Sequence, residues 1–222
     1  MKCELSRKKN IVNIVWFKKD LRSSDHAPLH EAALGEYPVL PIYVFEPDYW
    51  KQEDAAFRHW EFTKQSLEFL RADLSKLGQA LVFRKGKILE VFEDLRKEFT
   101  INAIYAHQET GNAWTFERDK SVRYWGRVNG VKIIEFQNNA IIRGLLDRDN
   151  WADERDKFMS KPIIEKRKVS NRNSGLSSNK KSPYSLDTVP KFLFKTPILT
   201  KGKGWRFSAS NTLPVMNWAC KL

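Results

Sequence analysis

The sequence has 222 residues, of which 41% are hydrophobic and 30% are charged, a balance typical of a folded domain rather than a low-complexity chain. The formal net charge of +12 lies in the carboxyl-terminal part, because residues 160–222 hold 13 Lys/Arg and 2 Asp/Glu whereas residues 1–159 hold 26 and 25. The nearly neutral body argues against a nucleic-acid-binding fold, and no run reaches the roughly 18 apolar residues of a membrane-spanning helix.

Residues 1–10 form a basic amino-terminal segment that we expect to be flexible. The segment lacks the apolar core of a signal peptide, so a cytoplasmic location is expected and a membrane partner is not. Cysteine occurs only at positions 3 and 220, which excludes a metal site built on cysteine and argues against a structural disulfide.

From residue 11 to about residue 160, apolar runs alternate with amphipathic stretches, which is the pattern of βα units. The expected elements, in chain order, are strand 11–17, helix 25–34, strand 39–45, helix 56–77, strand 80–83, helix 88–99, strand 104–106, helix 114–128 and strand 131–136. Five short strands joined by helices predict an α/β fold, a doubly wound five-stranded parallel sheet with helices on both faces.

Two residues and one segment refine this prediction. Asp25 is expected to cap the first helix. Pro41 inside the second strand requires a position near an edge or an irregularity of the sheet. Residues 138–159 are expected to end the domain with a turn and a short helix.

Residues 161–222 differ in composition from the body. Lys, Arg, Ser and Asn dominate residues 165–183, and prolines interrupt the remainder. Such a segment buries too little apolar surface to offset its chain entropy, so we predict a disordered basic tail. The abrupt change also motivates the hypothesis that these codons are read out of frame.

Three stretches of the sequence match a known pattern. The most specific, residues 14–29, is an apolar strand ending in Trp-Phe, then a basic pair, Asp-Leu-Arg and Asp-His-Ala-Pro-Leu. The others are residues 39–45 with the long helix after them, and residues 107–119 with His-Gln-Glu-Thr-Gly and Glu-Arg-Asp. Together they resemble the amino-terminal α/β domain of the photolyase/cryptochrome family, although Lys18 and Lys19 stand where that family usually has two arginines.

This resemblance implies a Rossmann-like sheet with strand order 3-2-1-4-5. In such a sheet a crevice lies where the order reverses, here between the carboxyl ends of strands 1 and 4. Residues 18–22 and 107–111 stand at those ends. The expected cofactor-binding residues of this crevice are Lys18, Arg22, His107, Glu109, Thr110, Gly111 and Trp114.

The resemblance also implies which chemistry the chain takes part in. In this family the α/β domain holds no catalytic residue and can carry an antenna folate or deazaflavin. FAD binds in a helical domain, which transfers an electron to damaged DNA and is the implied partner here. We therefore expect a chain from a truncated photolyase-like flavoprotein, without repair activity alone.

Structural interpretations of the turn after strand 1 stay open beside the functional ones. Lys18, Lys19 and Arg22 suit a solvated turn in which Asp20 pairs with Arg22. His107 suits a hydrogen-bonded structural residue.

The loop after strand 4 is equally open to a structural interpretation. Residues 109–111 suit a loop that caps the next helix through Thr110 or Asn112, and Arg118 and Asp119 suit pairing within that helix. The scattered tryptophans are expected in the core rather than in electron transfer.

A metal role is not expected for His26 and His30, because no third ligand is identifiable near them. No glycine-rich phosphate loop follows strand 1, which disfavours ordinary nucleotide binding. Two further functions remain open: a stand-alone antenna or partner-binding module, and weak DNA binding through the basic tail.

Overall fold

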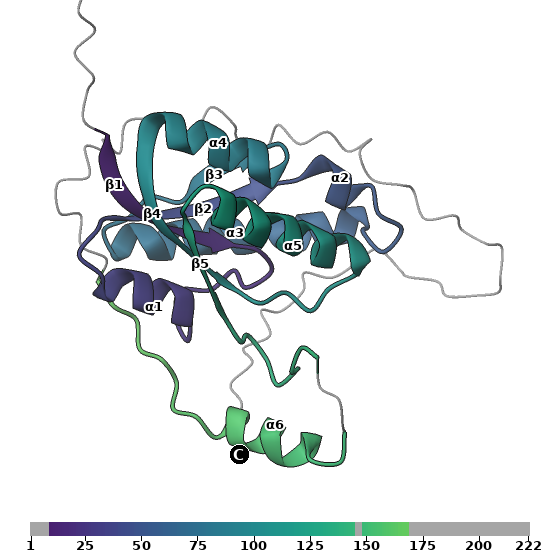
Figure 1. Ribbon diagram of the computed structural model, residues 1–222. Coiled ribbons are helices and arrows are strands. Elements are labelled where there is room, and N and C mark those ends of the chain that lie inside the picture. The colour runs from purple at the N-terminus through teal and green to yellow at the C-terminus, as the bar shows by residue number, and fades with distance from the viewer. Residues whose placement is uncertain (1–8, 145–147, 169–222) are drawn as a thin grey trace, which may run out of the picture.

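Figure 1 shows the computed structural model of the chain, in which residues 9–144 and 148–168 are described. A parallel sheet of five strands, in the order β3-β2-β1-β4-β5, forms its centre. The predicted α/β fold and the strand order implied by the resemblance are therefore confirmed. The tail beyond residue 168, both cysteines and residues 1–8 of the amino-terminal segment lie outside the described residues.

Strands alternate with helical segments along the chain up to the last strand, and the segment between β2 and β3 holds two helices. The strands are β1 (Asn10–Phe17), β2 (Val39–Phe45), β3 (Val82–Lys85), β4 (Phe99–His107) and β5 (Lys132–Phe136). The helices are α1 (Ala27–Leu34), α2 (Pro47–Trp50), α3 (Phe57–Lys76), α4 (Ile88–Glu98), α5 (Ala113–Val128) and α6 (Trp151–Met159).

Both faces of the sheet are buried, which explains why β1 is apolar along most of its length. Successive side chains of a strand point to opposite faces. Val15 and Phe17 pack into the core that includes α1 and α3, whereas Ile14 and Trp16 pack into the core that includes α4 and α5. The central strand is thus held between two separate hydrophobic layers.

Three elements differ from the prediction. β3 lies two residues later than expected, and the short helix α2 was not predicted. β4 begins at Phe99, directly after α4, where pairing with β1 at Asn10 turns the chain from helix to strand.

Pro41 pairs with Val15 of β1, but β2 meets β3 only from Ile42 onward, so the proline has no β3 neighbour. Pro41 therefore lies where β2 forms a local edge of the sheet, which is one of the two positions expected from the sequence.

The predicted cap of α1 is wrong. His26, not Asp25, is the N-cap residue, and its Nδ1 accepts a hydrogen bond from the Leu29 amide at 3.0 Å. Asp25 has φ of 49° and bonds residues that come much later in the chain. Its amide donates to the Ile164 carbonyl at 2.9 Å, and its Oδ1 accepts from the Ile164 amide at 3.2 Å. Figure 1 shows the green segment after α6 returning to the start of α1.

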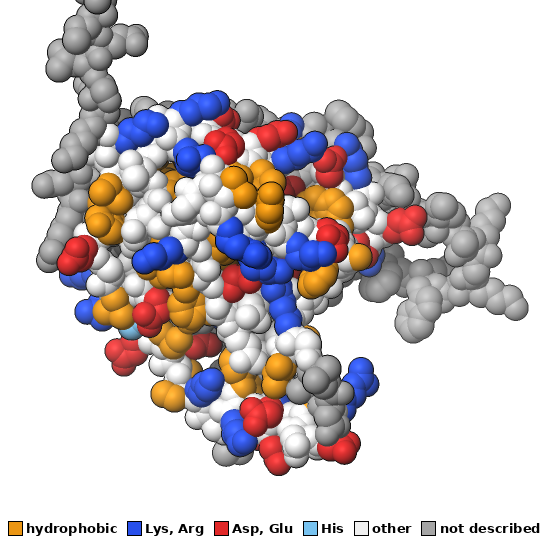
Figure 2. All heavy atoms as spheres, viewed as in Figure 1, with side chains coloured by type: hydrophobic (Ala, Val, Ile, Leu, Met, Phe, Trp, Pro, Cys, Tyr) orange, Lys and Arg blue, Asp and Glu red, His pale blue; other side chains and the backbone are white. Residues whose placement is uncertain are grey.

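The surface carries charges of both signs. On the face shown in Figure 2, basic and acidic side chains alternate over short distances, with apolar patches between them. Within the described ranges, no helix combines the length and the apolar character that crossing a bilayer requires.

Candidate ligand-binding site at the carboxyl ends of the strands

The carboxyl ends of β1 and β4 frame a small cavity of about 160 Å³. Two of the predicted residues, Arg22 and Trp114, do not line it. The Arg22 guanidinium turns aside and donates to the Asn138 side chain and to the Asp25 carbonyl. The predicted residues that line the cavity are Lys18, His107, Glu109, Thr110 and Gly111.

A larger cavity of about 340 Å³ lies beside it, toward β2, α2 and α3. This volume falls at the lower end of the roughly 300–1,000 Å³ of small-molecule sites. Lys18, Lys19 and Glu109 line both cavities. The larger cavity was not predicted from the sequence, because the expected crevice lay only between strands 1 and 4. The aromatic side chains that line it are Trp16, Phe17, Tyr43, Tyr49, Trp50 and Phe62.

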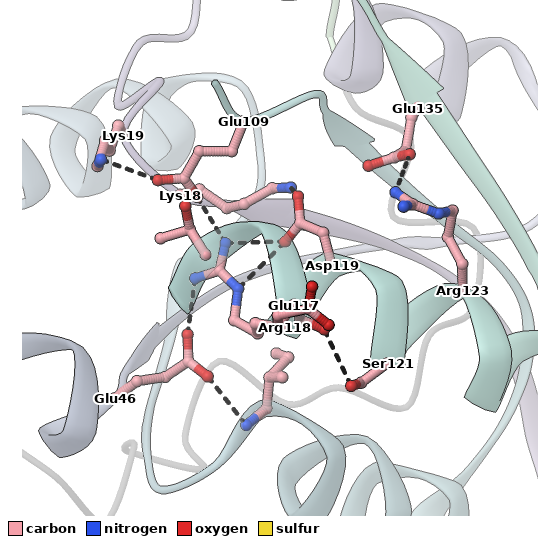
Figure 3. Close-up of polar contacts among 12 residues, drawn as sticks. Lys18, Lys19, Glu46, Glu109, Glu117, Arg118, Asp119, Ser121, Arg123 and Glu135 are labelled. Carbon is pink, nitrogen blue, oxygen red and sulfur yellow. Dashed lines mark hydrogen bonds and ion pairs between the residues drawn. The ribbon is translucent and has the colours of Figure 1, made fainter. Parts of the chain in front are cut away.

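Arg118 of α5 connects the ends of β2 and β4 beside this cavity (Figure 3). Its guanidinium donates to Glu46 after β2 at 2.8 Å, to Glu109 after β4 at 2.5 Å and to the adjacent Asp119 at 2.9 Å. Burial acts to lower the pKa of Arg118, but the three carboxylates outweigh it and hold this pKa above its ordinary value. Pairing within the helix was predicted, whereas the bonds to Glu46 and Glu109 were not.

Glu46 also bonds the amide of Ile88 at the start of α4, at 3.3 Å. Burial raises the pKa of Glu46, and Arg118 partly offsets that rise. No sequence motif identifies Glu46 as a site residue. It does follow directly after a buried strand, and ligand sites of parallel sheets lie at the carboxyl ends of the strands, so this position could have indicated it.

Lys18 is buried, so a solvated turn does not describe it. Its Nζ lies 2.9 Å from Asp119 Oδ2 and 4.4 Å from the centre of the Trp16 ring. Burial acts to raise the pKa of Asp119, but Lys18 and Arg118 hold it below its ordinary value. Lys19 remains half exposed, with its Nζ 2.9 Å from Glu109 Oε1.

The side chain of Asp20 does not pair with Arg22, so the predicted Asp20–Arg22 pair of the turn after strand 1 is wrong. Its Oδ2 lies 2.5 Å from His107 Nδ1 and 2.9 Å from His26 Nε2, and its Oδ1 accepts from the Lys18 amide. Burial acts to raise the pKa of Asp20, but the two histidines hold it well below 3.8. His107 is therefore a buried, hydrogen-bonded residue at the edge of the small cavity.

Asp20, His26 and His107 are close enough for a metal site, since one ligand atom from each lies within 4.8 Å of the others. The cap of α1 argues against that use. His26 Nδ1 accepts from the Leu29 amide, so the proton of a neutral His26 ring sits on Nε2 and points at Asp20. A metal ion bound to Nε2 would leave the proton of a neutral ring on Nδ1, where it would point at the Leu29 N–H. The cluster is therefore better suited to hydrogen bonds from the two histidines to Asp20 than to a metal ion.

The loop after β4 also has a structural role. Asn112 caps α5 by accepting from the Thr115 amide at 3.0 Å, which confirms one of the open interpretations. Thr110 is exposed and accepts from Asn139. A Cβ on Gly111 would lie 2.6 Å from Thr115 Oγ1, so close approach requires glycine here.

Tyr43 is the residue of the larger cavity that sequence reasoning passed over. It lies on β2, is 6% exposed, and lines the cavity. Its hydroxyl forms no hydrogen bond with any residue in the described part of the chain, and burial raises its pKa, so it stays protonated. Because Tyr43 lines the cavity, its hydroxyl can be reached by a ligand that occupies that space.

Trp114 lies outside both cavities and supports the wall of the larger one. Its ring centre is 5.7 Å from that of Tyr49, and the Arg118 guanidinium carbon lies 5.6 Å from it.

Trp50 and Trp60 lie in one core layer and Trp16 and Trp125 in the other, as predicted for the tryptophans. For Trp151 the prediction is wrong, because this residue at the start of α6 is 40% exposed.

Comparisons with known proteins agree with this geometry. A family model described as DNA photolyase matches residues 13–144. A curated relative, the blue-light photoreceptor PHR2 of Arabidopsis thaliana, is 38% identical over 104 residues, which cover 45% of this chain and 23% of the relative. The chain thus spans less than a quarter of the length of that relative.

Two solved structures share the fold. A cryptochrome of Synechocystis sp. PCC6803 has a TM-score of 0.66 and 18% identity, over 86% of this chain and 41% of the other. An archaeal photolyase from Sulfolobus tokodaii, described with two FAD molecules and a novel light-harvesting cofactor, has a TM-score of 0.59 and 19% identity. That match covers 71% of this chain and 37% of the other.

Proposed function

The chain belongs to the DNA photolyase family, and from this premise we propose that it is the light-harvesting α/β region of a photolyase- or cryptochrome-type flavoprotein. Its role is to hold an antenna ring, a folate, deazaflavin or flavin, in the larger cavity. The 222 residues by themselves carry out no DNA repair. In the family that step belongs to FAD in the helical domain, which is the expected partner.

The observation that carries this proposal is the aromatic cavity at the carboxyl ends of β1 and β2. Its volume of about 340 Å³ and its aromatic walls suit a planar ring. The unpaired Tyr43 hydroxyl supplies a polar group at which such a ring can be oriented. When bound, an antenna ring absorbs light for a neighbouring flavin, and the residues of this chain position it and exclude water.

Ring binding tests the proposal directly. The purified 222-residue chain is titrated separately with riboflavin, FAD, 5,10-methenyltetrahydrofolate and 8-hydroxy-5-deazariboflavin, and fluorescence is followed. We expect at least one ring to bind at one equivalent per chain. Binding of none of the four contradicts the proposal.

A matched pair of variants on α3 locates the site. Ser66→Phe projects a ring into the larger cavity and should abolish binding, since Ser66 lines its wall. Ser75→Phe adds the same ring at an exposed position of the same helix and should leave binding unchanged. Equal binding by the two variants would place the ligand elsewhere.

The absence of repair activity has its own test. Ultraviolet-damaged DNA is mixed with the chain and FAD, illuminated with blue light, and assayed for restored pyrimidines. We expect no repair above that in the same mixture without protein. Repair that depends on both light and the chain would overturn this part of the proposal.

A further inference from the structure

The charged groups around the larger cavity already balance one another. Arg118 donates from Nε and both terminal nitrogens to carboxylates, and Lys18 and Lys19 pair with Asp119 and Glu109. Lys18, Lys19 and Arg118 are thus matched by the carboxylates of Glu46, Glu109 and Asp119. Arg143, which also reaches Asp119, is matched by Glu135. A ring that carried its own charge would have to break one of these pairs or remain uncompensated in a buried site, and both are costly.

Tyr43 is an uncharged polar group of this wall whose hydroxyl forms no hydrogen bond with the described residues. Its hydroxyl lies in the field of Glu46, Tyr49 and Arg118, yet none of them hydrogen-bonds it. Elsewhere in the wall, Thr63 and Ser66 donate to carbonyls of their own helix, at His59 and Phe62. A protonated phenol donates one hydrogen bond and accepts another without changing the charge of the site.

The direction of the Tyr43 ring is fixed by its surroundings. Its ring stacks on Phe83 of the neighbouring strand, with centroids 5.8 Å apart and planes inclined by 19°. On its other side, Tyr43 pairs in register with Phe17 of β1. A side chain held between two strands in this way presents its hydroxyl in one place, which is what a specific contact requires.

We propose that Tyr43 is the specificity residue of the cavity and that it selects an uncharged planar heteroaromatic ring by donating a hydrogen bond to a carbonyl oxygen or ring nitrogen on the ring's edge. This inference rests on the proposed function and narrows it. Neutral flavin and pterin rings have such acceptors. A ring with a delocalised negative charge, such as an 8-hydroxydeazaflavin, is disfavoured.

The test compares two similar rings on three proteins. Riboflavin has an uncharged ring at pH 7.5, whereas 8-hydroxy-5-deazariboflavin has an anionic ring of nearly the same shape. Each is titrated into wild type, Tyr43→Phe and Tyr105→Phe, and dissociation constants are taken from fluorescence. Tyr105 of β4 does not line the cavity and serves as the matched control.

We expect wild type to bind riboflavin at least about tenfold more tightly than the anionic ring. Tyr43→Phe should weaken riboflavin binding about five- to tenfold, the size of one hydrogen bond, and Tyr105→Phe should not change it. Thermal melting should show no loss of stability in Tyr43→Phe, because its hydroxyl has no protein partner to lose. A lowered melting temperature would indicate a structural role instead.

The outcomes separate the two proposals. If both rings bind wild type equally, or if Tyr43→Phe binds riboflavin as wild type does, the cavity is a ligand site but Tyr43 does not select its ligand. If neither ring binds wild type, the inference falls. The proposed function then stands only if the folate or FAD of the wider panel binds.

Discussion

Asp20 illustrates how much depends on one buried carboxylate. It binds two imidazoles through one oxygen and the Lys18 amide through the other. It therefore fixes the turn that directs Lys18 inward to Asp119. From the sequence, Asp20 was part of an Asp-Leu-Arg motif and a possible partner of Arg22. Its actual partners at positions 26 and 107 could not be predicted, because they meet it only in three dimensions.

His26 makes the stability of the fold depend on pH. Burial lowers its pKa below 6.5, more strongly than Asp20 raises it. The unfolded chain therefore takes up a proton near pH 6.5 that the folded chain resists, and stability should fall as the pH decreases through that range. We expect the urea midpoint of wild type to decrease from pH 7.5 to pH 5.5.

The matched variant is His26→Asn, which keeps a capping side chain for α1 but cannot titrate. Its urea midpoint should change less over the same interval than that of wild type. Equal slopes in the two proteins would mean that His26 does not carry this dependence. Below pH 3.8 protonation of Asp20 should destabilise both proteins further, since that carboxyl is held charged in the fold.

At the scale of elements, α5 lies unusually close to β5. A Cβ on Gly126 would be 2.5 Å from a side-chain carbon of Ile133 and 2.9 Å from the Val131 carbonyl. Gly126→Ala thus sets two effects against each other. Alanine is favoured over glycine within a helix by about 1 kcal/mol, but overpacking costs about 1–3 kcal/mol.

Because backbone and a branched side chain both block the added carbon, we expect overpacking to win and Gly126→Ala to destabilise the fold by about 1–2 kcal/mol. Urea denaturation measures this change in the free energy of unfolding, and Ser121→Ala on the exposed face of α5 is the control. Ser121→Ala should change stability by no more than about 0.5 kcal/mol. A stabilised Gly126→Ala would mean that α5 can move away from the sheet.

Most elements could be predicted from hydrophobic periodicity, whereas their exact ends and the larger cavity could not. α3 and α4 were predicted to within a residue or so at either end, since their apolar faces repeat regularly. The first half of β4 was missed because it follows α4 without a loop. Tyr43 was assigned to a buried strand correctly, but nothing in an apolar run tells which hydroxyl will lack a partner.

At the scale of the whole molecule, the segment after α6 is attached to the start of the domain. Asp25 exchanges two hydrogen bonds with Ile164, and Lys166 lies 2.9 Å from Asp73 on α3. These exposed contacts are individually weak. We therefore expect them to govern local opening rather than global unfolding.

Asp25→Ala should speed amide hydrogen exchange in a peptide that spans residues 160–168, because it removes the acceptor for the Ile164 amide. Asp25→Asn should exchange as wild type does, since asparagine keeps that oxygen and tolerates a φ of 49°. Exchange in β1 should change little in either variant. Equal protection of the segment in Asp25→Ala and wild type would contradict this assignment.

The contacts at Asp25 and Asp73 also determine where any polypeptide that continues from residue 168 must start. That point lies beside α3, the helix that supplies Thr63 and Ser66 to the cavity wall. The 54 residues that follow residue 168 in the sequence therefore leave the described domain beside the helix that forms part of the cavity wall.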